Sequence, residues 1–208
     1  MDQKTIDTYN KIAIEYEEET DDFWQRFPSK IIPEFIRKVR KNEFRHKNGQ
    51  RRMILDIGSG PGRDGLIFEN SGCPVVCLDA SRVMIKMCRQ RGLQAITRDF
   101  MKIPFNNKSF AGVWAYTSLL HIHKKLMPKV LQEIYRVLKD DGIFGLGLIE
   151  GTEEIYTNNM MGDAPRFFAY YKKRELEEIL FDAGFEILYF EAFRPSSRRY
   201  LNFVMRKI

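Results

Sequence analysis

The sequence has few cysteines and no long apolar run, and both shortages narrow the class of protein. Its three cysteines, Cys73, Cys77 and Cys88, leave one unpaired in any disulfide scheme, and their spacing does not fit a zinc ribbon. We therefore expect reduced cysteines, no metal site and a cytoplasmic location. The longest apolar run, at 143–149, is far shorter than the roughly 20 residues of a membrane helix. The opening MDQKTIDTYN lacks the order of a signal peptide, so we expect no membrane partner.

The composition is that of one globular unit. The chain has 208 residues, of which 44% are hydrophobic, 13% aromatic and 30% charged, enough to fill a core without a disordered tail. No repeat or low-complexity segment divides it. We predict a single domain over 1–208, in which residues 1–50 supply helices placed against a core formed by 51–208. The sequence leaves open whether that domain is a monomer or a homodimer.

The net charge of +6 is unevenly distributed. Residues 36–52 hold eight Lys or Arg against one Glu, and residues 194–208 hold five against no acid, whereas the first 35 residues hold four against nine acids. Basic segments of this kind meet nucleic acid in some proteins. A solvated helix face and a charged sheet edge also account for these basic segments, and we favour this second interpretation.

The order of apolar patterns predicts an α/β fold. Near-continuous apolar runs at 53–57, 75–78, 94–97, 112–116 and 143–149 suit strands covered on both faces, and helical patterns at 63–70, 82–91 and 128–138 separate most of them. This alternation predicts a doubly wound, mostly parallel sheet. A helix is expected at 173–183, followed by strands at 185–193 and 199–206. The short loop between those two strands requires antiparallel pairing.

Two helical patterns precede the sheet. Tyr9, Ile12, Ala13 and Tyr16 recur at helical spacing and predict one amphipathic helix, and a second is expected over 29–44.

A glycine-rich loop follows the first predicted strand. In Asp56-Ile57-Gly58-Ser59-Gly60-Pro61-Gly62 the glycines permit a tight turn and close approach of a ligand to the backbone. The N–H groups of the following helix favour an anionic group there. A dinucleotide fingerprint would require a third glycine where Arg63 stands, so this loop does not fit that class.

Two carboxylates follow the next strands. Asp79 closes the second strand, where a carboxylate accepts hydrogen bonds from ribose hydroxyls, and Asp99 with Phe100 follows the third, where an amine and an aromatic base would fit. Together with the glycine loop, these strand ends predict a nucleoside-binding edge.

These segments resemble the class I S-adenosylmethionine-dependent methyltransferases. The resemblance rests on ILDIGSGPGRD, VVCLDAS and RDF, and extends through FAGVWAYTSLLHI, VLQEIYRVLKDDGIFGLGL and RYLNFVMRK, from about Met53 to Ile208. It implies a Rossmann-like sheet of seven strands with an antiparallel last strand, and S-adenosylmethionine as cofactor, with S-adenosylhomocysteine as product. YNKIAIEYEEE resembles the lid helix of small-molecule members, so the resemblance makes residues 1–50 lid helices.

The same resemblance implies the residues that hold the cofactor. The methionine end falls to Asp56 and the glycine loop, the ribose to Asp79, and the adenine to Asp99 and Phe100. The expected cofactor-binding set is Tyr9, Tyr16, Asp56, Gly58, Ser59, Gly60, Gly62, Arg63, Asp79, Ala80, Ser81, Met84, Asp99, Phe100 and Tyr116.

Candidates for catalysis and substrate binding lie beyond the fourth and fifth strands, where ligands of open α/β sheets bind. His121 is the candidate general base, although packing against the cofactor or capping a helix is the favoured interpretation of this residue. Many methyl acceptors need no base. The candidate substrate residues are Trp24, Arg26, Glu150, Arg166, Tyr170 and Tyr171. A solvated strand end explains Glu150 equally well, and hydrophobic cover of the sheet explains the others equally well.

The leading hypothesis is methyl transfer to a small molecule. Methyl transfer to RNA, tRNA or protein, with residues 36–52 and the C-terminal segment as the charged platform, is the second, and a non-catalytic S-adenosylmethionine-binding module is the third. The cofactor residues fit all three, so the sequence determines fold and cofactor better than substrate.

Overall fold

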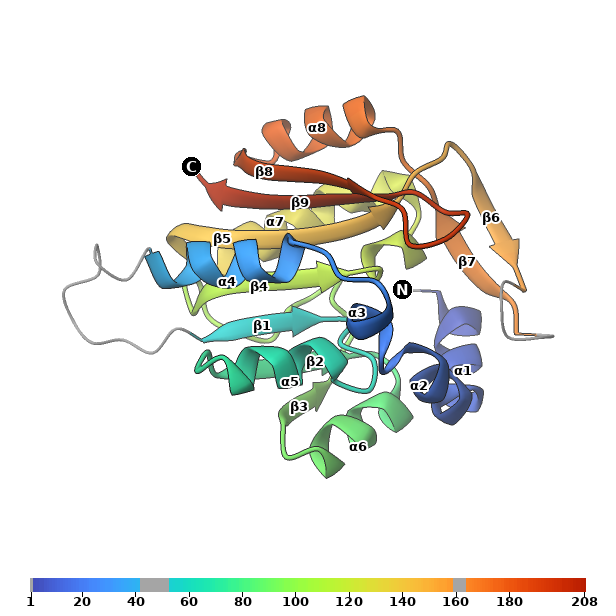
Figure 1. Cartoon of the computed structure of the whole chain (residues 1–208). Coiled ribbons are helices and arrows are strands. Elements are labelled where there is room, and N and C mark those ends of the chain that lie inside the picture. Colours follow the sequence, from blue (N-terminus) through green and yellow to red (C-terminus); the bar gives the residue numbers. More distant parts are fainter. Residues whose placement is uncertain (1, 42–52, 159–163) are drawn as a thin grey trace.

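The molecule is built around a seven-stranded sheet in the order β3-β2-β1-β4-β5-β9-β8, with helices on both faces (Figure 1). A computed structural model describes residues 2–41, 53–158 and 164–208. The strands of this sheet are β1 (Ile54–Ile57), β2 (Val75–Asp79), β3 (Gln94–Thr97), β4 (Phe110–Tyr116), β5 (Leu138–Ile149), β8 (Phe185–Phe193) and β9 (Tyr200–Lys207). Strands β6 (Glu154–Thr157) and β7 (Arg166–Ala169) pair separately as an antiparallel hairpin.

The helices of the described ranges fall into an N-terminal group and a group that covers the sheet. The first group is α1 (Gln3–Lys11), α2 (Ala13–Thr20) and α3 (Phe23–Arg26). The second is α4 (Ile31–Lys41), α5 (Arg63–Asn70), α6 (Arg82–Gln90), α7 (Met127–Val137) and α8 (Lys173–Asp182), with short 3-10 turns η2 (Leu119–His121) and η3 (Lys124–Leu126) after β4.

The pairing confirms the predicted doubly wound sheet. Strand β1 is parallel to both of its neighbours, β2 and β4, and β4 is parallel to β5. Strand β9 is antiparallel to both of its neighbours, β5 and β8. The chain reverses its winding direction between β1 and β4, and ligands of such sheets bind beyond the carboxyl ends of the strands at that point.

Two apolar layers hold the helices on the sheet. On one face, Phe35 of α4 and Phe68 of α5 pack on Trp114 of β4, with ring centroids 5.0 and 5.5 Å away. On the other face, Leu131 of α7 and Leu180 of α8 are fully buried in the second layer. Gly145 of β5 makes room for Trp114, because a β-carbon there would lie 2.2 Å from the indole.

The N-terminal helices and the β6–β7 hairpin lie together at the carboxyl ends of the parallel strands, at the right of Figure 1. The predicted single first helix is wrong: Ile12, with φ −99° and ψ 15°, separates α1 from α2. The predicted helix at 29–44 begins at Ile31, and residues 42–44 lie outside the described residues. Helix α3 and the hairpin were not predicted.

Strand β5 is longer than predicted. It begins at Leu138 instead of residue 143, because Leu138 already pairs with Phe110 of β4. The helix predicted at 128–138 consequently ends at Val137. Boundaries of the other core elements agree within two residues, so the predicted strand ends fall at the same edge of the sheet.

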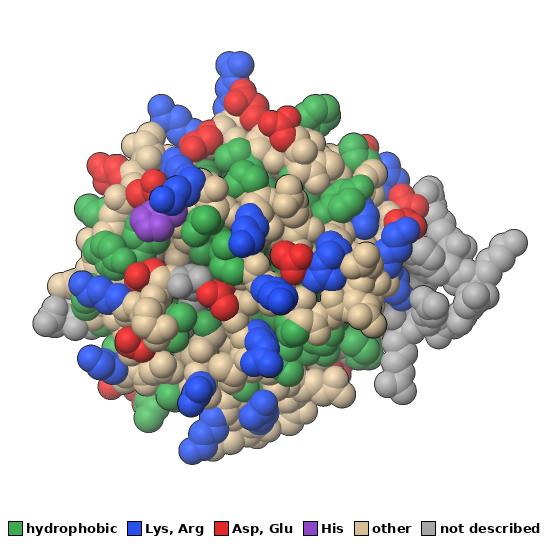
Figure 2. All heavy atoms as spheres, turned by 180° about the vertical axis from the view of Figure 1, so that it is seen from behind, with side chains coloured by type: hydrophobic (Ala, Val, Ile, Leu, Met, Phe, Trp, Pro, Cys, Tyr) green, Lys and Arg blue, Asp and Glu red, His purple; other side chains and the backbone are tan. Residues whose placement is uncertain are grey.

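Charged side chains of both signs are interspersed over most of the face seen in Figure 2. Residues 42–52, the larger part of the basic segment 36–52, lie outside the described residues. Within the described ranges, no helix combines the length and apolarity needed to cross a membrane.

Candidate active site

The glycine loop leads from β1 into α5, and two of its glycines cannot carry a side chain. Gly58 has φ +66°, and a β-carbon there would lie 2.3 Å from the β-carbon of Ser118. Gly62 caps α5 with φ +90°, and its β-carbon would lie 2.6 Å from Leu93. L-residues rarely adopt this left-handed region. The loop therefore packs close to the start of η2, with its backbone facing the carboxyl edge of the sheet.

Asp79 joins this loop to the end of β2. Its carboxylate accepts hydrogen bonds from the backbone N–H groups of Gly60 and Ser81, at 3.0 and 2.8 Å. Burial raises the pKa of Asp79 to about 6, against the hydrogen bonds, which favour the charged form. Asp79 thus positions the loop and presents a buried carboxylate to the space above it.

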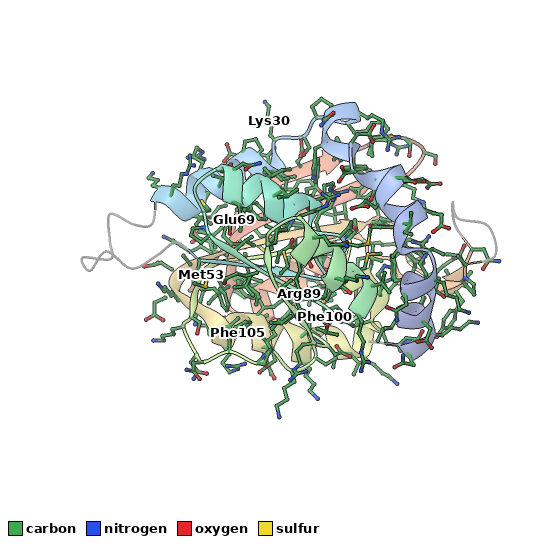
Figure 3. All side chains as sticks on the ribbon, turned by 90° about the horizontal axis from the view of Figure 1, so that it is seen from below. Lys30, Met53, Glu69, Arg89, Phe100 and Phe105 are labelled. Atoms are coloured by element: carbon green, nitrogen blue, oxygen red, sulfur yellow. The ribbon has the colours of Figure 1, made fainter. Side chains whose placement is uncertain are left out.

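That space is the inner cavity, of about 450 Å³ including the part that is open to solvent. Ala80, Met84 and Phe100 supply its apolar wall, and Gly58, Gly60 and Asp79 supply its backbone and carboxylate surface. In Figure 3, Phe100 lies toward the N-terminal helices, at the opposite end of the sheet from Met53. Asp99, predicted beside the adenine, is not in the lining; its Oδ1 accepts from the N–H of Met101 at 2.9 Å.

A smaller polar cavity of about 340 Å³ adjoins the inner one. It is lined by Asp56, Ser59, Arg63 and Asp64 together with the glycine loop. Among the described residues, Oδ2 of Asp56 has no hydrogen-bond partner although it is buried. Burial and the nearby charge of Asp64 raise its pKa well above the ordinary range. Because buried polar atoms are normally satisfied, Asp56 is suited to a donor group of a ligand.

Asp64, which sequence reasoning missed, is the most strongly held carboxylate of the site. It accepts hydrogen bonds from the side-chain nitrogens of Arg63 at 2.7 Å, Trp24 at 2.7 Å and Trp114 at 2.8 Å. Burial opposes its ionisation, but Arg63 and the indoles keep the pKa of Asp64 below its ordinary value. This arrangement fixes Arg63 at the floor of the polar cavity.

Tyr9 of α1 lies between His121 and Arg166. Nδ1 of His121 is 2.6 Å from the carbonyl oxygen of Phe167, which only accepts, so Nδ1 carries the proton. Nε2 therefore accepts from the Tyr9 hydroxyl at 2.8 Å, and Arg166 donates to the same hydroxyl at 3.2 Å. Burial lowers the pKa of His121 to about 3. His121 is thus a neutral imidazole whose acceptor nitrogen is occupied.

Further hydrogen bonds hold the N-terminal helices over the cavities. The side-chain oxygen of Asn10 accepts from the hydroxyl of Ser81 at 2.7 Å, and the hydroxyl of Thr5 accepts from the N–H of Phe167 at 3.0 Å. Thr8 donates to the carbonyl of Pro165 at 2.8 Å. Arg91 of α6 pairs with Glu17 of α2 and with Asp21, both at 2.6 Å. These helices close the site on the side away from the sheet.

A larger outer cavity of about 1810 Å³ opens beyond Tyr9. Its walls combine aromatic and aliphatic side chains with four arginines, Arg26, Arg63, Arg166 and Arg198. Three residues, Tyr16, Tyr116 and Thr117, line the inner, polar and outer cavities alike. Thr117 has φ +54°, an unusual conformation for a β-branched residue that is typical of functional positions.

The structure brings together most of the residues predicted to hold the cofactor. Those in the inner or the polar cavity are Tyr9, Tyr16, Asp56, Gly58, Ser59, Gly60, Arg63, Asp79, Ala80, Met84, Phe100 and Tyr116. Ser81 and Gly62 line neither; they cap α6 and α5. Asp99 lines neither cavity either, and for the whole set contact with the cofactor stays a prediction.

The predicted substrate residues separate into two groups. Arg26 and Arg166 line the outer cavity, whereas Trp24, Glu150, Tyr170 and Tyr171 are outside its lining. Trp24 donates to Asp64, and Glu150 pairs with Arg199 at 2.9 Å. Tyr171 is fully buried, and Tyr170 stacks on Phe168. Sequence reasoning missed Asn10, Thr117 and Arg198.

The central part of the chain matches a known family. Residues 54–142, from β1 into β5, match the model of a family described as "Methyltransferase domain". The match covers the glycine loop and Asp79.

Three comparisons illustrate the likeness. The chain is 26% identical to a sterol 24-C-methyltransferase of Clavispora lusitaniae over 90% of its own length and 57% of that protein's. It is 32% identical to a sarcosine/dimethylglycine N-methyltransferase of Aphanothece halophytica, over 44% of this chain and 35% of the relative. The Burkholderia thailandensis 1,6-didemethyltoxoflavin-N1-methyltransferase, solved with its acceptor and S-adenosylhomocysteine, aligns at a TM-score of 0.69 and 19% identity, covering 96% and 87% of the two chains.

The chain spans little more than half of the sterol methyltransferase that it matches. With the strand order and the glycine loop, the family match shows that residues 54–142 form a core like that of the methyltransferase-domain family, in a Rossmann-like fold.

Proposed function

We propose that this protein transfers the methyl group of S-adenosylmethionine to a small-molecule acceptor. The observation that carries the proposal is the meeting of three cavities at Tyr16, Tyr116 and Thr117. S-adenosylmethionine has an adenosine end, an amino-acid end and a methyl group, all attached to one sulfonium. The inner cavity would take the adenosine end and the polar cavity the amino-acid end, and the methyl group would point into the outer cavity.

Each branch of the cofactor has residues suited to hold it. The buried carboxylate of Asp79 would accept from the two ribose hydroxyls, and Phe100 with Met84 would enclose the adenine. In the polar cavity, Oδ2 of Asp56 would accept from the ammonium group and Arg63 would face the carboxylate. When bound, the cofactor supplies an electrophilic methyl group.

The contribution of the chain to catalysis is then mainly positioning. Methyl transfer is an in-line displacement, and holding the reactants in line contributes up to about 7–11 kcal/mol to lowering the barrier. Tyr9 and Tyr16, whose rings meet edge to face at 5.4 Å, cover the junction and exclude water. His121 acts as a positioning residue for Tyr9. Nε2 of its neutral ring accepts a hydrogen bond from the Tyr9 hydroxyl and is therefore not available to take a proton from the methyl acceptor.

The size of the outer cavity supports a small-molecule acceptor. The part of it that a ligand can fill, about 750 Å³, falls within the roughly 300–1,000 Å³ of ordinary ligand pockets. The names of the sterol and sarcosine methyltransferases and of the structural neighbour likewise refer to small acceptors.

Calorimetry with S-adenosylhomocysteine tests the cofactor half of the proposal. We expect a dissociation constant in the low micromolar range, roughly −8 kcal/mol. Asp79→Ala should weaken binding by about 10- to 100-fold, because two ribose hydroxyls lose their acceptor. Glu186→Ala, on the outer strand β8 and paired with Arg206, is the matched control and should bind normally. Tight binding of NAD in place of S-adenosylhomocysteine would contradict the proposal.

A methyl-transfer assay with a panel of small acceptors tests the catalytic half. Formation of S-adenosylhomocysteine that depends on a small acceptor supports it. Binding of S-adenosylhomocysteine without turnover on any acceptor favours the non-catalytic module, and turnover on tRNA alone favours the second hypothesis.

A further inference from the structure

The outer cavity holds two guanidinium groups that converge on one aromatic ring. The Arg166 guanidinium lies 5.4 Å from the centroid of the Phe168 ring, and that of Arg198 lies 5.9 Å from the same centroid. Arg166 comes from β7 and is buried, whereas Arg198 comes from the loop between β8 and β9. Two different elements of the chain thus each place a positive charge next to the same aromatic ring.

Two further arginines of the cavity are paired with carboxylates, and two of its acids are exposed. Arg63 is held by Asp64 at 2.7 Å, and Arg26 by Asp22 at 2.7 Å. The carboxylates of Glu18 and Glu19 line the cavity from exposed positions on α2. Within the described part of the chain, Arg198 lies within ion-pair distance of no carboxylate. Its positive charge is therefore uncompensated inside a partly enclosed space.

The cation–π contact with Phe168 pairs no N–H donor of Arg198 with an oxygen. These N–H donors form a planar fork that matches the two oxygens of a carboxylate or phosphate. The adjoining wall is apolar, with Phe168, Leu120 and Ile149. Such a wall accommodates the uncharged body of the same molecule.

We infer that the methyl acceptor carries an oxyanion, a carboxylate or a phosphate monoester, which Arg198 binds beside Phe168, while the apolar body of the acceptor packs on the adjoining wall of the outer cavity. This inference rests on the proposed function and names the substrate class of the same site.

Calorimetry on the protein saturated with S-adenosylhomocysteine tests this inference. The probes are aromatic and aliphatic carboxylic acids, each with its primary amide, and phosphate monoesters with their parent alcohols. At least one anion should bind about 10- to 100-fold more tightly than its neutral counterpart, the range for a charged hydrogen bond. The class of probe that binds more tightly, carboxylic acid or phosphate monoester, identifies the oxyanion. If no anion binds more tightly than its neutral counterpart, or amines bind instead, the inference is wrong.

Variants of one loop locate the effect. Arg198→Gln should remove the preference for the anion, and Arg198→Lys should keep part of it. Arg194→Gln, at an exposed position of the same loop outside the cavity lining, is the control and should behave as the parent protein. All three should bind S-adenosylhomocysteine normally, because Arg198 lines only the outer cavity. If the parent protein does not bind S-adenosylhomocysteine, the proposed function is wrong. If Arg198→Gln keeps the full preference for the anion over its neutral counterpart, this inference alone is wrong.

Discussion

The indole N–H of Trp24 donates to Asp64 at 2.7 Å, so a side chain of the N-terminal segment completes the hydrogen bonding of a buried carboxylate in the core. Trp114 of the central strand β4 donates to the other oxygen of the same carboxylate. One group therefore links the segment that covers the cavities to the sheet that forms their floor. The position of α3 over the site depends on this shared acceptor.

Removing the indole donor of Trp24 should destabilise the N-terminal segment more than the sheet. We expect Trp24→Phe to lower the free energy of unfolding by about 1–2 kcal/mol, since Asp64 keeps its bonds to Arg63 and Trp114. Trp114→Phe should cost more, because its ring is fully buried. Urea denaturation compares the two, and hydrogen exchange of residues 5–25 locates the change. A larger loss for Trp24→Phe than for Trp114→Phe would contradict this assignment.

The titration of Asp79 should affect cofactor binding and stability in opposite directions. Its native pKa of about 6 lies above the ordinary 3.8, so between these pH values the native state binds more protons than the unfolded state. The free energy of unfolding should therefore fall as pH rises through this window. Cofactor affinity should instead rise, by about tenfold from pH 5 to 7, because the ionised carboxylate is the form that accepts ribose hydroxyls.

The control for this pH dependence is Asp79→Asn, which keeps the shape without the titration. Calorimetry from pH 5 to 7 should show a flatter profile for this variant, with any residual slope due to Asp56. Equal slopes in the parent and the variant would mean that Asp79 is not the titrating group.

His121 should remain neutral across the physiological range. Because burial lowers its pKa to about 3, the ring should keep its proton on Nδ1 and none on Nε2 from pH 5 to 8. Nitrogen-15 NMR of labelled histidine distinguishes the two ring nitrogens, and His121→Gln assigns the signals. A titration of these signals near pH 6.5 would restore His121 as a candidate general base.

The N-terminal helices should become more ordered when cofactor binds. Tyr9 and Tyr16 face the inner cavity from α1 and α2, so a ligand there adds contacts to both helices. Hydrogen exchange of residues 5–25 should slow on addition of S-adenosylhomocysteine, whereas α8, on the far edge of the sheet, should exchange as before. Equal exchange with and without ligand would make these helices ordinary core packing.

Most of the fold could be predicted because the apolar runs of the buried strands and the helical spacing of 63–70 are unambiguous. The break at Ile12 could not, since Tyr9, Ala13 and Tyr16 keep one spacing on both sides of it. The four-residue strands β6 and β7 are too short for periodicity to separate them from loop. Their pairing is visible only in three dimensions.

The site was predictable where chemistry follows directly from a strand end. Asp56, Asp79 and the glycine loop are such cases. Asp64 was not, because an acid in the first turn of a helix is expected from the helix dipole alone. Arg198 stands in a basic loop that the sequence presents as a charged sheet edge, and only the course of β8 and β9 brings it over Phe168.

The hydrogen bonds of α1 also bear on the order in which the chain folds. Its partners lie far along the sequence: Thr5 and Thr8 bond to residues 162 and 157 positions away, and Tyr9 to one 112 positions away. Contacts between distant residues must overcome a large loop-closure entropy, so they form after the local structure that they join. We therefore expect α1 to dock after the sheet and the β6–β7 hairpin that it contacts have formed.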